Sequence, residues 1–161
     1  MTQSASVQSA ARELDETALT ALAQRLAGVV GEGGVIHLHG DLGAGKTTFA
    51  RALLRALGVG ERVKSPTYSL IESYAVGDLA AHHLDLYRIA DPGELEWLGL
   101  ADLATGKHLI LIEWPERAGN AAPAPDLTVH LAHAGARRTL RFVAKSTTGA
   151  AWLARLMPVE A

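Results

Sequence analysis

The chain contains no cysteine among its 161 residues, so disulfide bonds, thiolate zinc sites and cysteine nucleophiles are all excluded. No apolar run approaches the roughly 20 residues that a membrane-spanning helix needs. The segment 1–11 is rich in Ser, Ala and Gln and lacks the apolar centre of a secretory signal. The formal net charge is −2, which gives no general signal for nucleic-acid binding. These absences predict a cytoplasmic protein without a membrane segment, and any RNA would be held by another chain.

The chain does have enough apolar residues for a core. Hydrophobic residues make up 48% of the sequence, which excludes an intrinsically disordered chain. A length of 161 residues suits one domain that buries a sizeable core. Beyond the first residues there is no internal repeat, low-complexity segment or domain boundary. We therefore expect a flexible segment over residues 1–11 and a single domain over residues 12–161.

The stretch from Gly40 to Thr47, GDLGAGKT, fits the phosphate-binding pattern G-x-x-x-x-G-K-[ST]. Residues 35–39 before it are typical of a short buried strand, and apolar residues after it recur every four positions, as on one face of a helix. In such a loop the backbone N–H groups point at the phosphates, and the helix N-terminus adds a partial positive charge. Lys46 is expected to contact the β- and γ-phosphates, and the Thr47 hydroxyl to bind Mg²⁺. The motif predicts a protein that binds a nucleoside triphosphate.

Periodic segments on both sides of this motif predict a helix and a hairpin. Apolar residues at helical spacing indicate a helix from Asp15 to the glycines at 31–34. Residues 69–76 and 79–87 flank Gly77-Asp78, a dipeptide typical of a two-residue turn. These two segments are therefore expected to form an antiparallel hairpin.

The remaining segments complete an α/β pattern. Asp91-Pro92-Gly93 is typical of the start of a helix. Alternation over residues 127–142, around Gly135, predicts a second hairpin. Residues 150–157 predict a closing helix with Trp152 in the core. We expect an α/β fold of the P-loop type, in which helices flank a central, mostly parallel sheet with antiparallel hairpins.

Two acidic residues on predicted strands are candidates for chemistry. The apolar run 108–113 ends in Glu113, and a buried strand of this kind delivers a carboxylate beside Mg²⁺ and the attacking water in P-loop proteins. Alternation places His83 and Asp85 on one face of the first hairpin, where Asp85 suits an oxygen ligand for Mg²⁺. His82 points to the opposite face, so we do not expect a zinc site at these adjacent histidines.

Two polar segments leave alternatives open. Ser65 and Thr67, on either side of Pro66, follow the P-loop helix, where a nucleotide switch would lie. They either reach the γ-phosphate or the metal, or belong to a connector that the proline stiffens. The second segment is a basic cluster formed by Arg137, Arg138 and Arg141. This cluster is either a solvated strand face or a contact for a phosphate or an acidic partner.

Four ordered blocks of sequence resemble the TsaE (YjeE) family: GDLGAGKTTFAR, KSPTYSLIESY, HHLDLYRIADPGELEWLGL and LIEWPER. The match covers roughly residues 13–145 and is far more specific than a lone P-loop. This family is the P-loop ATPase of bacterial tRNA threonylcarbamoyladenosine (t6A) biosynthesis. The resemblance implies a small α/β fold, ATP or ADP and Mg²⁺ as ligands, and action in a complex with TsaB and TsaD. There TsaD, with TsaB, transfers the threonylcarbamoyl group to tRNA, and the ATPase supports multiple turnover.

The resemblance also implies roles for individual residues. Asp85 matches the aspartate of the family's H-x-D-L-Y-R block, in which His83 holds the histidine position. Glu113 and Trp114 match the acid and the tryptophan of its I-E-W-P block. Ser65, Pro66 and Thr67 match its switch loop. Together with the motif, this gives the expected nucleotide-binding residues Asp41, Leu42, Gly43, Ala44, Gly45, Lys46, Thr47, Thr48 and Trp114. The expected metal ligands are Thr47, Asp85 and Glu113, and the expected catalytic residues are Lys46 and Glu113.

A small-molecule kinase is the alternative function, because it would use the same P-loop. A kinase also needs an acceptor pocket, a base and usually a lid with arginines, for which Arg88 and Arg117 are candidates. The sequence contains no lid-like insertion. A nucleotide-gated binding module with negligible hydrolysis is a third possibility, against which Glu113 argues weakly. The expected activity is thus a slow, Mg²⁺-dependent ATPase that its partners stimulate, with tRNA bound only through the complex.

Overall fold

A computed structural model of the chain describes residues 7–59, 71–89, 93 and 107–156. The expected switch residues Ser65, Pro66 and Thr67 lie outside the described residues. The helix expected to start at Asp91-Pro92 also falls there, apart from Gly93. The described residues show no helix that is long and apolar enough to cross a membrane.

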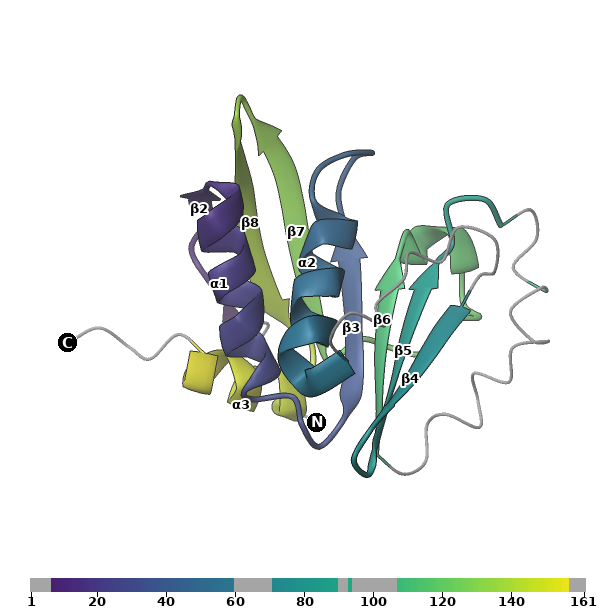
Figure 1. Cartoon of the computed structure of the whole chain (residues 1–161). Coiled ribbons are helices and arrows are strands. Elements are labelled where there is room, and N and C mark those ends of the chain that lie inside the picture. Colours follow the sequence, from purple (N-terminus) through teal and green to yellow (C-terminus); the bar gives the residue numbers. More distant parts are fainter. Residues whose placement is uncertain (1–6, 60–70, 90–92, 94–106, 157–161) are drawn as a thin grey trace, which may run out of the picture.

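The described strands form one mixed sheet (Figure 1). Its order is β1-β8-β7-β3-β6-β5-β4, and β2 also pairs with β8. The strands are β1 (Val7–Gln8), β2 (Arg12–Leu14), β3 (Gly34–His39), β4 (Ile71–Val76), β5 (Leu79–Asp85), β6 (His108–Glu113), β7 (Leu127–Ala134) and β8 (Arg137–Ala144). The central strands β7, β3, β6 and β5 run parallel, whereas the hairpins β4–β5 and β7–β8 are antiparallel. The expected α/β fold with a mostly parallel centre is confirmed.

Strand β3 occupies the middle of the sheet, because it pairs with β6 on one side and β7 on the other. In parallel strands the carboxyl ends meet at one edge, and ligands of open α/β sheets bind there. At this edge β3 leads into the P-loop, β5 ends at Asp85 and β6 ends at Glu113. Parallel pairing aligns Asp85 with Glu113. The topology thus gathers residues that are far apart in the sequence.

The helices pack on the sheet through their apolar sides (Figure 1). They are α1 (Glu16–Ala27), α2 (Lys46–Leu54) and α3 (Thr147–Leu156), with shorter turns η1 (Arg55–Val59) and η5 (Pro115–Ala118). Asp15 caps the start of helix α1, because its carboxylate accepts a hydrogen bond of 2.8 Å from the N–H of Ala18. Helix α2 packs against α1 on one face of the sheet. The positive φ of Gly58 breaks the helical path beyond α2.

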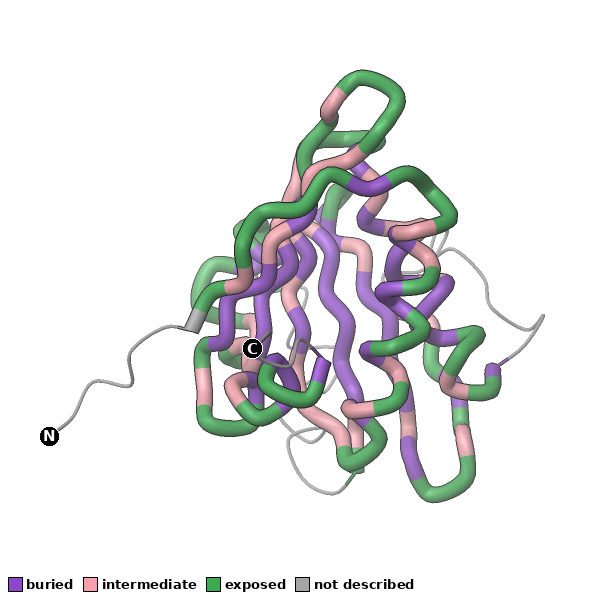
Figure 2. Tube along the Cα trace, turned by 90° about the vertical axis from the view of Figure 1, so that its left-hand side faces the viewer, coloured by how far each residue is buried: buried purple, intermediate pink, exposed green. Residues whose placement is uncertain are grey.

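Alternation along β6 divides the buried residues between the two faces of the sheet. Leu109 and Leu111 join the core beneath the helices, together with Phe49 of α2. Ile110 and Ile112 belong to a second, smaller cluster on the other side. Figure 2 shows buried residues along the central strands and exposed residues in the connecting loops. The central strands are thus buried on both faces, as parallel strands usually are.

Two ends of the domain differ from the expected pattern. The segment 1–11, expected to be a flexible extension, contributes Val7–Gln8 to the sheet edge, and the N–H of Ser9 donates to the carbonyl of Phe142 at 2.9 Å. Helix α3 starts at Thr147 and not at residue 150. The Ser146 hydroxyl accepts a hydrogen bond from the N–H of Gly149 at 3.0 Å, which satisfies a free donor of the first turn.

Candidate functional site

The loop between β3 and α2 needs glycine at its two ends. Gly40 has φ 153°, and a Cβ at this position would lie 2.5 Å from the carbonyl oxygen of Leu131. Gly45, the residue before α2, is left-handed with φ 110°. Between them the N–H of Ala44 donates to the carbonyl of Asp41 at 3.0 Å. The loop thus wraps tightly and delivers Lys46 and the residues after it at the N-terminus of a helix, where anions bind favourably.

Lys46 is 4% exposed, which is unusual for a lysine. Its Nζ donates to the carbonyls of Gly40 and Asp41 and lies 3.8 Å from the centroid of the Trp114 ring. Burial lowers the pKa of Lys46, and the negative charge of Glu113 opposes that change. The ammonium group therefore lies in a partly desolvated place where an anionic phosphate would compensate it.

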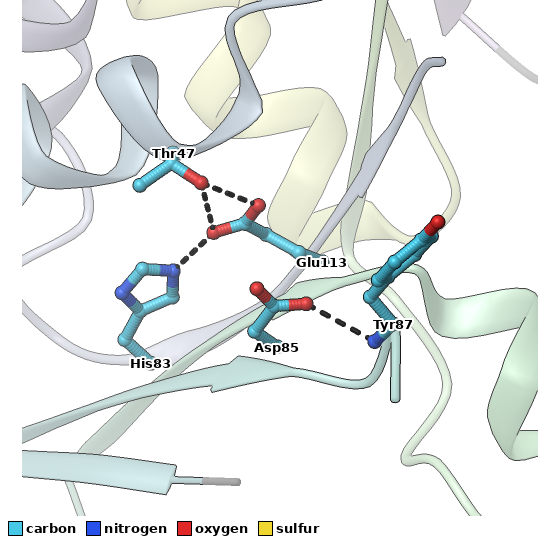
Figure 3. Close-up of polar contacts among 5 residues, drawn as sticks. All are labelled: Thr47, His83, Asp85, Tyr87 and Glu113. Atoms are coloured by element: carbon cyan, nitrogen blue, oxygen red, sulfur yellow. Dashed lines mark hydrogen bonds and ion pairs between the residues drawn. The ribbon is translucent and has the colours of Figure 1, made fainter. Parts of the chain in front are cut away.

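Thr47 and Glu113 join α2 to the end of β6 (Figure 3). The Thr47 hydroxyl lies 2.8 Å from Oε1 and 3.0 Å from Oε2 of Glu113. The carboxylate is 2% exposed and also contacts Nε2 of His83, at 2.6 Å from Oε2. The acid at the tip of the buried strand is thus fixed by two side chains from different elements.

Asp85 lies beside Glu113 at the end of β5. One of its oxygens, Oδ1, accepts a hydrogen bond of 3.1 Å from the N–H of Tyr87. Burial raises the pKa of the Asp85 carboxyl above its ordinary value, and the charge of Glu113 adds to the rise. A cation between these carboxylates would relieve that repulsion.

The oxygen atoms of Thr47, Asp85 and Glu113 fit Mg²⁺. In the described part of the chain no three His, Cys, Asp or Glu side chains are placed to hold a metal ion. Mg²⁺ does not need such a cage, because in nucleotide sites it is bound by one or two carboxylates, substrate phosphates and water. The donor set would suit a metal that is bound together with a nucleotide.

A cavity of about 320 Å³ opens at this edge of the sheet. The expected site residues that line it are Leu42, Gly43, Gly45, Lys46, Thr47, Thr48, Asp85, Glu113 and Trp114. Two others do not line it: Ala44 is fully buried below the loop, and Asp41 is exposed and offers its carbonyl to Lys46. The structure thus brings most of the expected residues to one cavity.

The wall beside β6 is aromatic and cationic. Trp114 has the left-handed conformation, φ 59°, as the chain turns from β6 into Pro115. Its ring lies 4.9 Å from that of Tyr87, and the Arg117 guanidinium lies 5.2 Å from the Tyr87 ring. Neither Arg117 nor the exposed Arg88 lines the cavity. Of the two arginines considered for a kinase lid, Arg117 thus lies against the outer side of two lining aromatic rings, 5.9 Å from the Trp114 ring, and neither arginine enters the cavity.

Other residues line the cavity without having been expected there: Glu16, Leu19, Tyr87, Ala136 and Arg138. The Arg138 side chain passes over Gly45, with Cγ and Nε 3.9 Å from the place of a Cβ at that glycine. Arg137 is exposed, and Arg141 donates to Gln8 at 3.1 Å. The basic cluster was the only sequence signal for Arg138, and only one of its three arginines reaches the cavity.

The adjacent histidines point in opposite directions, as alternation predicts. His82 contacts the Ser73 hydroxyl at 2.8 Å and Nδ1 of His108 at 3.0 Å, on the face away from α2. His83 faces α2 and Glu113. Only His83 therefore belongs to the candidate site.

The comparisons with known proteins agree with each other. A family model described as "Threonylcarbamoyl adenosine biosynthesis protein TsaE" matches residues 14–140. A TsaE protein from Haemophilus influenzae is 40% identical over 115 residues, covering 71% of this chain and 73% of that protein. The TsaE protein of Bacillus subtilis is 38% identical over 115 residues, with 71% and 72% covered. A crystal structure of Bacillus subtilis YdiB has a TM-score of 0.77 at 27% identity, covering 95% of this chain and 96% of that one.

Proposed function

The chain belongs to the TsaE family of threonylcarbamoyl adenosine biosynthesis proteins, and on this premise we propose that it is the Mg²⁺-dependent ATPase subunit of tRNA t6A formation. The observation that carries the proposal is the meeting of Lys46 and Thr47 with Glu113 in one cavity. A P-loop lysine and hydroxyl bind phosphates and a metal, and a strand-end acid acts on water. The three residues together supply a phosphate contact, a metal ligand and a candidate base for hydrolysis of a nucleoside triphosphate.

Phosphate binding falls to the loop and to Lys46. The N–H groups at the start of α2 donate to the phosphate oxygens, and the Lys46 ammonium exchanges its carbonyl acceptors for the β- and γ-phosphates. Because Lys46 is already buried at the loop, little ordering of its side chain remains to be done. The Trp114 ring beside it keeps water from the ammonium group.

Glu113 is the residue that acts on the attacking water. Mg²⁺ held by Thr47, Asp85 and Glu113 would neutralise charge on the phosphate oxygens during the reaction. The Glu113 carboxylate, at the carboxyl end of β6, orients a water molecule and accepts its proton. Its hydrogen bonds to Thr47 and His83 limit the directions in which its oxygens can point. Arg138, which lines the cavity beside Gly45, adds positive charge near the phosphates.

This activity serves a complex in the cytoplasm. The chain carries a formal charge of −2 and gives no general basic signal for holding tRNA. TsaB and TsaD are the partners that the family implies, and tRNA is contacted through them. Hydrolysis changes the phosphates that the loop holds, so that the ATP and ADP forms bind the partners differently.

Phosphate release measures the proposed function directly. ATP hydrolysis should be slow with the purified chain, faster when TsaB and TsaD from the same organism are added, and absent without Mg²⁺. The matched control is Lys46→Ala, added to the same partners. Stoichiometric transfer of phosphate to a small metabolite, in place of its release, would instead support a small-molecule kinase.

A further inference from the structure

His83 is the one fully buried histidine among the described residues, and it touches the candidate catalytic acid. Its Nε2 lies 2.6 Å from Oε2 of Glu113, and neither side chain is more than 2% exposed. The other ring nitrogen, Nδ1, is buried without a hydrogen-bond partner. An unpartnered polar atom in a core is costly, so this histidine is not explained by the packing of the sheet alone.

The parallel pairing of β5 with β6 creates this contact. His83 lies opposite Leu111, and Asp85 lies opposite Glu113. Side chains two residues apart on a strand share a face, so His83 is the diagonal neighbour of Glu113 on the face toward α2. A long carboxylate side chain can lean back along the strand to reach the imidazole, as Figure 3 shows.

The hydrogen-bond geometry assigns the proton. A carboxylate only accepts hydrogen bonds, so a contact of 2.6 Å to an ionised Glu113 requires a proton on Nε2. His83 thus donates to Glu113 through Nε2.

Nucleotide binding affects the two hydrogen-bond donors to Glu113 differently. The Thr47 hydroxyl is shared with the nucleotide site, where its oxygen is to bind Mg²⁺. His83 lies behind the carboxylate, out of contact with the cavity, and has no competing ligand. Its hydrogen bond to Oε2 therefore persists when the nucleotide binds, and leaves Oε1 for the metal or the attacking water.

We propose that His83 is a positioning residue for hydrolysis, which fixes the Glu113 carboxylate through an Nε2–H···Oε2 hydrogen bond. The inference rests on the proposed ATPase function and adds a residue that acts through Glu113 and does not touch the nucleotide. A displacement of about 1 Å in a reacting group can lower a rate by about 100-fold, so loss of this hydrogen bond acts on kcat. It does not act on the nucleotide affinity, which belongs to the P-loop.

Two amide variants test the role without removing polarity from the core. The amide nitrogen of the longer Gln side chain in His83→Gln reaches the place of Nε2. The Asn side chain in His83→Asn is too short to bring its nitrogen there. We expect His83→Asn to lower kcat for ATP hydrolysis by about 10- to 100-fold, with KM and ADP affinity within about threefold. His83→Gln should restore most of kcat. His82→Asn, on the other face of the same strand, is the matched control and should retain the wild-type kcat.

Histidine nitrogen NMR gives a second, spectroscopic readout. The ring of His83 should show the tautomer protonated at Nε2, and its Nε2 proton should shift in Glu113→Ala but not in His82→Asn. A wild-type kcat in a folded His83→Asn, equal losses in the Gln and Asn variants, or an Nδ1–H tautomer would each overturn the inference. If wild-type hydrolysis itself does not depend on Lys46, the proposed function fails, and the role of His83 fails with it.

Discussion

The Nζ atom of Lys46 lies 3.8 Å from the centroid of the Trp114 ring, although Lys46 starts α2 and Trp114 follows β6, far away in the sequence. A cation at this distance over an indole face is attracted by its quadrupole. The same ammonium donates to loop carbonyls, so its direct contacts in this structure are to neutral groups. Phosphate oxygens are stronger acceptors for a cation than carbonyl oxygens are. The Lys46 ammonium is therefore expected to leave the loop carbonyls for phosphate when a nucleotide binds.

Lys46→Ala should abolish productive ATP binding. The substitution removes the buried cation that we propose binds the phosphates, and one or two charge-assisted hydrogen bonds are worth about tenfold to 100-fold or more in affinity. Calorimetry with ATP and Mg²⁺ checks the loss. Lys145→Ala, which removes an exposed lysine outside the cavity, is the control and should bind like the wild type. Hydrolysis at the wild-type rate in Lys46→Ala would disprove the P-loop assignment.

Asp85→Asn should raise the Mg²⁺ concentration needed for half-maximal ATPase activity. The amide keeps the shape of the side chain but removes one charged oxygen from the proposed metal site, and it leaves the P-loop unchanged. A Mg²⁺ titration of hydrolysis measures the midpoint. Asp78→Asn changes an exposed aspartate that pairs with Lys107 in the hairpin turn, and it serves as the control. An unchanged midpoint in Asp85→Asn would show that Asp85 does not bind the metal and has a structural role instead.

Glu113→Ala should separate ATP binding from hydrolysis. Loss of a positioned base lowers turnover by about 100-fold or more, whereas ground-state affinity should stay within several-fold. Because the carboxylate accepts bonds from Thr47 and His83, Glu113→Gln is the companion variant that keeps the volume and one acceptor. Single-turnover hydrolysis and ATP binding are measured on both. A collapse of affinity with an unchanged rate at saturation would make Glu113 a binding residue.

Protonation of His130 should make the fold less stable in acid. Burial, the neighbouring His39 and the charges of Arg141 and Lys145 lower the pKa of His130 to about 4, whereas the unfolded chain titrates at the ordinary 6.5. Between these values the unfolded state binds more protons, so the free energy of unfolding falls as the pH drops from about 6.5 to about 4. His37, His39 and His82, whose pKa values burial also lowers, act in the same direction.

His130→Gln tests this expectation. Urea unfolding at pH 7 and pH 5 should show a smaller acid-induced loss of stability in the variant than in the wild type. His133→Gln, which changes the exposed histidine on the same strand, should behave like the wild type. An equal loss in wild type and His130→Gln would mean that other groups cause the acid sensitivity.

The sequence predicted most of the fold because its elements carry strong local signals. The P-loop motif placed β3 and α2, and Gly77-Asp78 and Gly135 placed the hairpins. The short strands β1 and β2 escaped prediction, because two or three residues show no periodicity. They form only because β8 presents an edge to which they bond.

The candidate site was predicted in part, for a related reason. Motif residues such as Lys46 and Glu113 carry their chemistry in the local sequence. The place of Arg138 and Glu16 in the cavity depends on how β8 and α1 pack beside the loop, which no local pattern records. Alternation placed His83 on the correct face, but its bond to Glu113 depends on the register between β5 and β6. Contacts that depend on long-range strand pairing can thus be identified only from the structure.

Threonylcarbamoylation of tRNA over many cycles tests the central claim most directly. TsaB, TsaD, tRNA and the activated threonylcarbamoyl donor are combined with ATP and Mg²⁺, with this protein, with its Lys46→Ala variant, or with neither. We predict that modified tRNA exceeds the amount of TsaD many times over only with the wild-type protein, and stays near one equivalent otherwise. A yield that is the same in all three reactions would contradict the account.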